Sequence, residues 1–489
     1  MHHQKNLIAT DIETYLKQHE NKGLLRLITC GSVDDGKSTL IGRLLYDSKM
    51  IFEDQLLAIE KDSKKVGTQG GELDLALLVD GLQSEREQGI TIDVAYRFFS
   101  TDKRKFIIAD TPGHEQYTRN MATGASTADL AIVLIDARQG VLTQTRRHSY
   151  IVSLLGIRHM VVAINKMDLV DFSQERFEDI KRDYEQLIPS LPNHERISFE
   201  YLPISALNGD NVVYLSSNTP WYKGIALMEL LDTVDIEQPN NTDEGKFRFP
   251  VQYVNRPHLD FRGFSGTIAA GSIKTGDEIT ILPSGKTTRI KSIILPGISD
   301  RVVCGKEELL TAKEAFAPMA ITLTTEDEVD ISRGDMIVRS DHLPRVSNSL
   351  KVMMVWMSDV PMKLTESYYI KSATTVLKGS FDHINYKVDV NTYERLQVNE
   401  LHLNDIASCK LVLNRPIAAD PYTINRYTGS FIVIDRMTNN TLGAGMIIDV
   451  SRREQDSLMS NQREYTQAEI ELNAYIRKHY PEWKCINIS

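Results

Sequence analysis

The pattern of apolar and polar positions differs between the two halves of the chain. In the first half, apolar residues form continuous runs. Continuous apolar runs rich in Val, Ile and Leu stand at 24–30, 105–110, 129–137 and 159–166. Runs of this kind are typical of parallel strands that are buried on both faces of a sheet. Helical spacing at 38–47 and 145–156 supplies the crossovers between them. The pattern predicts a doubly wound, mostly parallel α/β sheet.

The pattern changes after the polar stretch 238–246, where apolar and polar residues begin to alternate. Short alternating strands separated by glycine turns run from Phe247 to about Ser340 and again from about Ser347 to Ser451. Spaced short strands with turn signals predict two small β-barrels. We therefore expect an N-terminal extension at 1–23, the α/β domain at 24–240, barrels at 246–341 and 345–452, and a tail at 453–489 with a helix at 464–479.

Composition narrows the class of protein. With 489 residues the chain is long enough for about three domains. A net charge of −10 disfavours a dedicated nucleic-acid binder, and no stretch approaches 18 consecutive apolar residues. The four cysteines lie far apart without a CxxC spacing, which disfavours a zinc site or a disulfide framework. We expect a soluble, cytoplasmic protein without nucleic-acid or membrane partners.

A glycine-rich loop follows the first apolar run and precedes a helix. It reads GSVDDGKST and comprises Gly31, Ser32, Val33, Asp34, Asp35, Gly36, Lys37, Ser38 and Thr39. In a P-loop of this spacing the backbone N–H groups surround the phosphates, Lys37 bridges the β- and γ-phosphates, and Ser38 ligates Mg²⁺. A second match, SGKTT at 284–288, lacks the leading glycine and is expected to be a hairpin turn.

Two further segments identify the nucleotide base. The first, after the strand at 159–166, is Asn165, Lys166, Met167 and Asp168, and the second is Ser205, Ala206 and Leu207. A carboxylate at 168 can accept from both the ring N–H and the exocyclic amine of guanine, and adenine cannot match that pattern. The combination predicts GTP rather than ATP as the ligand.

The strand at 105–110 leads into a segment suited to sensing the γ-phosphate. It comprises Asp110, Thr111, Pro112, Gly113 and His114. Asp110 is expected to reach Mg²⁺ through water, and His114 to orient the attacking water as Gln does in other GTPases. Thr91, in the segment GIT, would complete the Mg²⁺ ligands, so that the expected metal set is Ser38, Thr91 and Asp110, with Lys37, Thr91 and His114 as the catalytic residues. The alternative is that His114 is simply a histidine in a turn at the surface.

These motifs, in this order, resemble those of the translational GTPase superfamily, which includes elongation factor Tu. Longer segments such as 84–125 and 247–267 resemble more closely the large GTP-binding subunit of heterodimeric sulfate adenylyltransferase. The dense part of the resemblance covers about 24–340, and it is only general over 345–452.

The resemblance implies a smaller catalytic partner subunit that joins ATP and sulfate into adenylyl sulfate and pyrophosphate. Because that anhydride forms uphill, the present chain would couple GTP hydrolysis to it. In translational GTPases an acidic residue at the position of Asp34 can help hold a monovalent cation near the phosphates. Without a second P-loop, we expect no adenylylsulfate kinase activity. We assign no sulfate ligand, since Arg256 and Arg262 better fit solvated or interface roles.

Two other functions fit the same architecture. A factor that delivers aminoacyl-tRNA would need a surface that neutralises several phosphates, which the acidic composition does not favour. A purely regulatory GTPase would hydrolyse GTP without any coupled synthesis. The segments 84–125 and 247–267 favour the sulfate-activating function over both.

Overall fold

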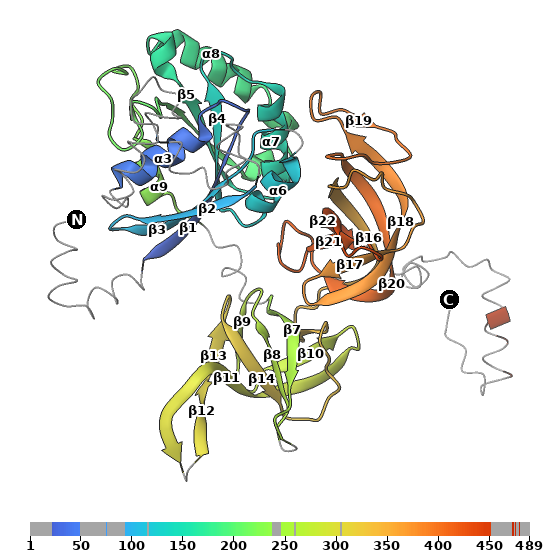
Figure 1. The fold of residues 1–489 in the computed structure, drawn as a ribbon. Coiled ribbons are helices and arrows are strands. Elements are labelled where there is room, and N and C mark those ends of the chain that lie inside the picture. Colours follow the sequence, from blue (N-terminus) through green and yellow to red (C-terminus); the bar gives the residue numbers. More distant parts are fainter. Residues whose placement is uncertain are drawn as a thin grey trace.

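The structure is a computed structural model. It describes residues 22–48, 75, 93–114, 117–236, 246–258, 261–303, 306–450, 472, 473, 475 and 479. Thr91, the predicted extension up to residue 21 and most of the predicted tail helix at 464–479 lie outside the described residues. Figure 1 shows three bodies, an α/β domain and two β-barrels, arranged around a common centre.

The N-terminal domain, here the G domain, is built on a six-stranded sheet in the order β2-β3-β1-β4-β5-β6. Its strands are β1 (Gly23–Cys30), β2 (Ala95–Ser100), β3 (Arg104–Asp110), β4 (Leu130–Asp136), β5 (His159–Asn165) and β6 (Ser198–Pro203). All neighbours are parallel except β2, which pairs antiparallel with β3 at the edge. The prediction of a mostly parallel sheet is confirmed, and β2 and β6 are the strands that the hydrophobic pattern did not predict.

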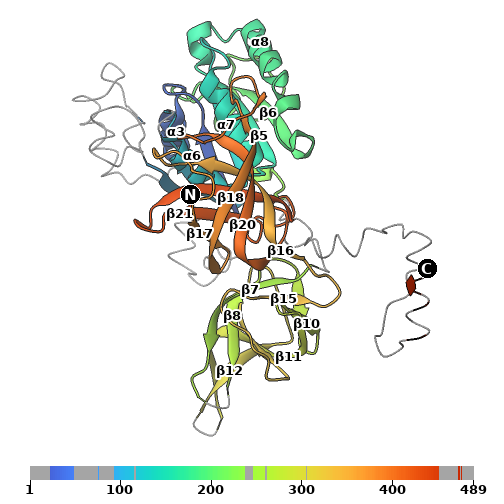
Figure 2. The same ribbon diagram turned by 90° about the vertical axis from the view of Figure 1, so that its right-hand side faces the viewer.

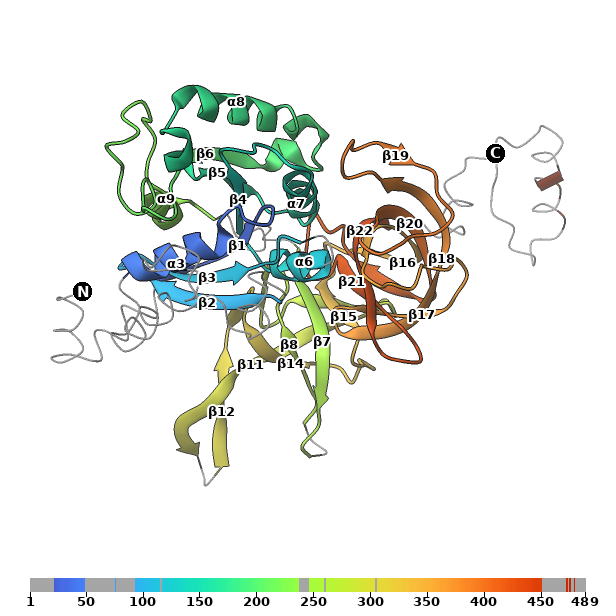
Figure 3. The same cartoon turned by 45° about the horizontal axis from the view of Figure 1, so that its top comes forward.

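Helices cover both faces of this sheet. They are α3 (Lys37–Asp47), α6 (Thr118–Ser126), α7 (Thr143–Leu154), α8 (Gln174–Glu185) and α9 (Leu227–Thr233). Alternate residues of β4 belong to two separate cores, one shared with α3 and α9 and the other with α6, α7 and α8. Figure 3 shows α8 and α7 on the side away from α3 and α9. All seven residues of β4 are buried, which explains why the strand has an uninterrupted apolar sequence.

The carboxyl ends of the parallel strands carry the polar residues. The register pairs Thr29 with Asp110 across β1 and β3, and Asp136 with Asn165 across β4 and β5. Ligands of open α/β sheets bind outside this edge, because the loops that leave it converge there. The fold therefore brings segments that are far apart in sequence to one end of the sheet.

Each barrel closes because the two strands at the ends of a six-stranded order also pair with each other. In the first, β10 pairs with both β15 and β11, which closes a ring of β10, β15, β7, β8, β14 and β11. In the second, the ring is β17, β21, β22, β16, β20 and β18. The first barrel's strands are β7 (Arg248–Asn255), β8 (Gly263–Thr267), β9 (Ser272–Lys274), β10 (Glu278–Leu282), β11 (Lys286–Val303), β12 (Lys306–Ala312), β13 (Glu314–Phe316), β14 (Ala320–Thr325) and β15 (Met336–Arg339). The second barrel's strands are β16 (Arg345–Trp356), β17 (Tyr368–Ser372), β18 (Thr375–Val388), β19 (Arg395–Leu396), β20 (Ile406–Ala419), β21 (Ser430–Ile434) and β22 (Thr441–Val450).

The segment SGKTT is the turn of a hairpin. β10 and β11 pair antiparallel on either side of it, with Ile281 opposite Lys286. Gly285 has a φ of 76°, a left-handed conformation that suits glycine in such a turn. The expectation that this segment is not a second P-loop is confirmed.

Among the described residues no helix is long and apolar enough to cross a membrane.

The second barrel packs on the G domain along α7, as the rotated view in Figure 2 shows. The Tyr393 hydroxyl donates to the carbonyl of Arg146 at 3.1 Å, and its ring stacks on Tyr150 with 5.5 Å between centroids. The Tyr422 hydroxyl donates to the carbonyl of Leu155 at 3.2 Å. Apolar side chains of the barrel continue the core that α7 shares with the sheet. The helix is thus held from both sides.

A buried ion pair joins the two barrels. Arg248 donates from Nε to one carboxylate oxygen of Asp420 at 3.0 Å and from a terminal nitrogen to the other at 3.1 Å. Removing one member leaves the other charged and buried, so we expect Asp420→Ala to lower the free energy of unfolding by about 3–5 kcal/mol. The measurement is equilibrium denaturation followed by a probe in the barrels.

A matched control is available in the second barrel. Arg345 and Asp449 also form an ion pair at 3.0 Å, but their side chains are more than half exposed. Exposed pairs contribute little, so Asp449→Ala is expected to cost less than about 1 kcal/mol. Equal losses for the two variants would show that burial is not what makes the Arg248 pair important.

Candidate nucleotide-binding site

The glycine-rich loop has the backbone of a phosphate-binding turn. It connects β1 to α3, and the N–H of Leu40 donates to the carbonyl of Gly36 at 2.9 Å to begin the helix. Gly36 has a φ of 91°, and a side chain there would collide with the amide of Asn165. Glycine is therefore required at 36 both for the conformation and for the close approach. The N-terminus of α3 points at the site, which favours bound phosphate.

Lys37 is buried and lies over the loop. Its ammonium donates to the carbonyl of Ser32 at 2.7 Å and reaches that of Gly31 at 3.4 Å. Burial lowers the pKa of Lys37, while the nearby carboxylates of Asp35 and Asp110 oppose that shift. The amine is thus held against the backbone of the glycine-rich loop.

The two acidic residues of the loop face different ways. Asp34 is exposed, with a left-handed φ of 66°, whereas Asp35 is buried. The Asp35 carboxylate accepts from the N–H of Ser32 at 2.5 Å and from that of Asp136 at 3.3 Å. Burial raises the pKa of Asp35 to about 6, against the lowering effect of Lys37 and of these two N–H groups. Asp35 therefore ties the loop to the end of β4.

A hydroxyl and a carboxylate converge at the start of α3. The Ser38 hydroxyl lies 3.3 Å from one carboxylate oxygen of Asp110, and the Thr29 hydroxyl lies 3.4 Å from the other. Oxygen atoms of this kind are the ligands that Mg²⁺ prefers. Ser38 and Asp110 thus fit a magnesium site, whereas the third expected ligand, Thr91, lies outside the described residues.

Gly113 lies directly against the glycine-rich loop. A Cβ atom there would stand 2.6 Å from the Lys37 ammonium and 2.9 Å from the Ser32 carbonyl oxygen, so only glycine fits. His114 follows immediately and is exposed, with its carbonyl accepting from the N–H of Tyr117 at 3.0 Å. Its ring centroid is 6.1 Å from that of Tyr117. His114 is thus the residue directly after Gly113, which lies against the P-loop lysine.

Asn165 joins three loops of the site. Its side-chain amide donates to the carbonyl of Asp35 at 2.8 Å, and its oxygen accepts from the N–H of Ala206 at 2.9 Å. Arg43 of α3 reaches the same segment and donates to the carbonyls of Ala206 and Leu207. The P-loop and the segment at 205–207 are therefore held in one rigid arrangement, as a shared ligand requires.

A buried carboxylate at the end of β4 orders the base-reading segment. Asp136 is fully buried and accepts from Lys166 at 3.0 Å and from Arg138 at 2.7 Å. Burial alone would raise the pKa of Asp136, but the hydrogen bonds from Arg138 and Lys166 outweigh it and hold the pKa at about 2. Asp168 follows in a short helical turn, Met167–Val170, with a half-exposed side chain.

The remaining predicted residues lie around this frame. The Thr111 hydroxyl donates to the carbonyl of Thr29 at 2.6 Å. Ser205 is buried, and the Ser205 hydroxyl accepts from the N–H of Asn208 at 3.3 Å. Pro112 and Met167 are buried, while Val33 and Thr39 are half-buried. Apart from Thr91, the structure therefore gathers the predicted site residues at the carboxyl edge of the sheet.

His148 of α7 is a site residue that the sequence motifs do not single out. It is fully buried, and its Nδ1 accepts from the N–H of Gly31 at 3.1 Å. An accepting Nδ1 places the ring proton on Nε2, which has no hydrogen-bond partner among the described residues. Burial lowers the pKa of His148 to about 3, and Lys37 adds to that effect. The neutral ring thus fixes the orientation of the first amide of the P-loop.

The His148 contact leads to a paired prediction. His148→Leu leaves the Gly31 N–H buried without an acceptor, which costs about 1–3 kcal/mol, so we expect nucleotide affinity to fall roughly tenfold or more. His148→Asn places an oxygen near the position of Nδ1 and should stay within about threefold of the parent chain, an expectation from that same hydrogen-bond cost. Titration calorimetry measures both. Equal losses in the two variants would mean that ring packing, not the acceptor, matters at 148.

The chain is similar to known proteins over nearly its whole length. Residues 22–240 match the family model "Elongation factor Tu GTP binding domain", and residues 349–448 match "GTP-eEF1A C-terminal domain-like". The chain is 65% identical to sulfate adenylyltransferase subunit 1 of Sulfurovum sp. (strain NBC37-1), over 99% of both chains. It is 61% identical to the protein of that name from Aliarcobacter butzleri, over 99% of both, and 57% identical to that from Saccharophagus degradans, over 100% of this chain and 99% of the relative. With a GTPase domain at its N-terminal side and such relatives along its full length, the chain belongs to the family of sulfate adenylyltransferase subunit 1.

Proposed function

We propose that the chain hydrolyses GTP and couples this hydrolysis to the formation of adenylyl sulfate and pyrophosphate from ATP and sulfate on a smaller catalytic subunit. The observation that carries GTP as the ligand is the rigid frame at the sheet edge, and the relatives named sulfate adenylyltransferase subunit 1 support the coupled synthesis. Asn165 joins the phosphate loop to the segment at 205–207, and Asp136 holds Lys166 just before Asp168. A site built to hold phosphates and base in one geometry supports GTP as the ligand.

Each part of the site has one task in the proposed hydrolysis. The amides of the loop and Lys37 bind the phosphates and stabilise the charge that develops on the γ-phosphoryl group. Asp168 accepts from guanine. Ala206 and Leu207 lie beside the base, in a loop whose carbonyls accept hydrogen bonds from Arg43. His114 orients the water that attacks the γ-phosphorus, because it follows the glycine that contacts Lys37.

Cations complete the proposed site. Ser38 and Asp110 would hold Mg²⁺, together with Thr91 in the GTP state, and when bound Mg²⁺ neutralises charge on the β- and γ-phosphates. The exposed carboxylate of Asp34 would help hold a monovalent cation near the phosphates. Equal GTPase rates in potassium and in a large organic cation would contradict this role of Asp34.

Coupling explains why synthesis needs a GTPase subunit. The mixed phosphoric–sulfuric anhydride forms uphill, so a second downhill reaction must drive it. We place both subunits in the cytoplasm, where ATP and GTP are both present. This chain offers no assigned sulfate ligand, and the proposal leaves ATP and sulfate to the partner.

Reconstitution tests the proposed function. The purified chain is mixed with a sulfate adenylyltransferase catalytic subunit, ATP and sulfate, and adenylyl sulfate is measured with and without GTP. We expect a GTP-dependent rise in adenylyl sulfate together with GTP hydrolysis. No rise would overturn the proposal, and retention of aminoacyl-tRNA by the GTP-bound chain would favour the delivery function instead.

A further inference from the structure

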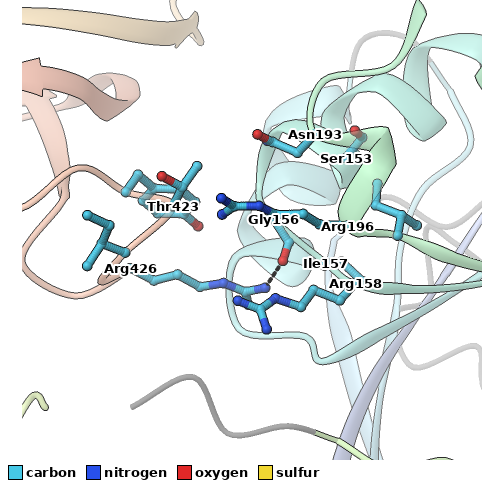
Figure 4. A pocket seen from close by; sticks show the side chains of 11 residues that line it. Ser153, Gly156, Ile157, Arg158, Asn193, Arg196, Thr423 and Arg426 are labelled. Atoms are coloured by element: carbon cyan, nitrogen blue, oxygen red, sulfur yellow. Dashed lines mark hydrogen bonds between the residues drawn. The ribbon is translucent and has the colours of Figure 1, made fainter. Parts of the chain in front are cut away.

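A small cleft lies between the G domain and the second barrel, away from the nucleotide site. The G domain lines it with the end of α7 and the following segment, which includes Gly156 and Arg158, and with the short helical turn His194–Arg196. The barrel contributes the loop between β20 and β21, with Thr423 and Arg426. Figure 4 shows the two sets of side chains approaching each other across the cleft.

Positive charge gathers among the residues that line this cleft. Arg158, Arg196 and Arg426 line it, whereas none of its lining residues is Asp or Glu. The chain as a whole carries a net charge of −10, so the cluster runs against its composition. Three guanidinium groups around one cleft repel one another, and that repulsion is relieved by a bound anion.

The partners of two arginines show which donors remain available. Arg426 donates to the carbonyls of Ala128 and Gly156, which are uncharged acceptors. The Asp129 carboxylate acts on Arg426 electrostatically, but it accepts from the N–H of Arg26 at 3.1 Å and does not line the cleft. Within the described part of the chain, the exposed guanidinium of Arg196 has no hydrogen-bond or ion-pair partner.

The size of the cleft limits the ligand. The space open to water is about 40 Å³, roughly that of three water molecules at about 10–15 Å³ each. A tetrahedral oxyanion displaces a few waters and therefore matches this space. The Thr423 hydroxyl and the Asn193 amide add uncharged donors at the rim.

We propose that this cleft is a binding site for a small tetrahedral oxyanion, such as sulfate or phosphate, that bridges the G domain and the second barrel. Arg196 and Arg158 hold it from one side and Arg426 with Thr423 from the other. Because the ligand contacts both domains, it stabilises the arrangement in which they are packed together. This inference is independent of the coupling to adenylyl sulfate formation.

Thermal unfolding of the full chain tests the site. The chain is kept saturated with GDP and Mg²⁺, so that the P-loop is occupied, and the Tm is followed against sulfate or phosphate at constant ionic strength. We expect a saturable rise for at least one of the two anions, and the anion that saturates at the lower concentration identifies the preferred ligand. Arg196→Ala should raise the half-saturating concentration tenfold or more, whereas Arg196→Lys keeps most of the effect.

A matched variant separates binding from general salt effects. Arg182 of α8 is exposed like Arg196 but pairs with Asp179, outside the cleft. Arg182→Ala should respond to both anions as the parent chain does. A rise that does not saturate, or one that is the same in Arg196→Ala and the parent chain, would overturn the proposal, because sulfate and phosphate stabilise many proteins without a site.

Discussion

His114→Ala is expected to slow GTP hydrolysis by about 10²-fold or more while leaving GTP affinity nearly unchanged. The ring follows Gly113, whose backbone lies against Lys37 and Ser32, and in the proposed site it faces the terminal phosphate of a bound GTP. It is exposed and therefore contributes little to the stability of the fold. Its effect should thus fall on the transition state and not on binding. Single-turnover hydrolysis with radiolabelled GTP measures the rate, and equilibrium titration measures the affinity.

A neighbouring ring provides the control for His114. Tyr117 lies 6.1 Å away between centroids and has no assigned catalytic role. Tyr117→Phe should hydrolyse GTP within a few-fold of the parent chain. If His114→Ala instead lost affinity while its turnover stayed unchanged, the histidine would be a structural residue of the loop.

Asp168→Asn is expected to weaken GTP binding by about 10²-fold, because in the proposed site it replaces a carboxylate that accepts two hydrogen bonds from guanine, each worth about 1.5–3 kcal/mol. Xanthine carries a carbonyl where guanine carries its exocyclic amine. The side-chain amide introduced by the substitution would donate to that carbonyl, so the variant should bind xanthosine triphosphate better than the parent chain does. Competition binding with GTP, ATP and xanthosine triphosphate measures the three affinities.

The gain with xanthosine triphosphate guards against a trivial explanation. A variant that had merely lost its fold would bind no nucleotide, whereas a variant with altered base recognition exchanges one ligand for another. Asp171→Asn, three residues further along, serves as the matched substitution and should keep the preference for GTP. An unaltered preference for GTP over ATP in Asp168→Asn would refute the assigned role.

The strand ends account for most of what could be predicted from the sequence. Asp110 and Asn165 each close a buried strand, and parallel strands place such ends at one edge, so their proximity follows from the hydrophobic pattern. Asp136 closes β4 in the same way and obeys the same rule. No short motif contains it, although its position at the end of a buried strand is sufficient to place it at the site.

Other contributions to the site depend on tertiary packing. His148 lies inside α7, and no periodicity shows which side chain of a buried helix meets the P-loop. Arg43 has the sequence pattern of an exposed helical arginine, yet it reaches the carbonyls of the segment at 205–207. The edge strand β2 is also hard to predict, since only one of its six residues is buried. The cleft with Arg196 and Arg426 joins segments more than 200 residues apart and has no local signature.

The position of the synthetic equilibrium tests coupling most directly. With both subunits, ATP, sulfate and a system that regenerates GTP, the ratio of adenylyl sulfate times pyrophosphate to ATP times sulfate is followed to steady state. Coupling predicts that this ratio rises above the value reached without GTP, and that it returns to that value with His114→Ala or with a GTP analogue that cannot be hydrolysed. If GTP only shortened the approach to the same final ratio, the chain would be a regulatory GTPase and coupling would be contradicted.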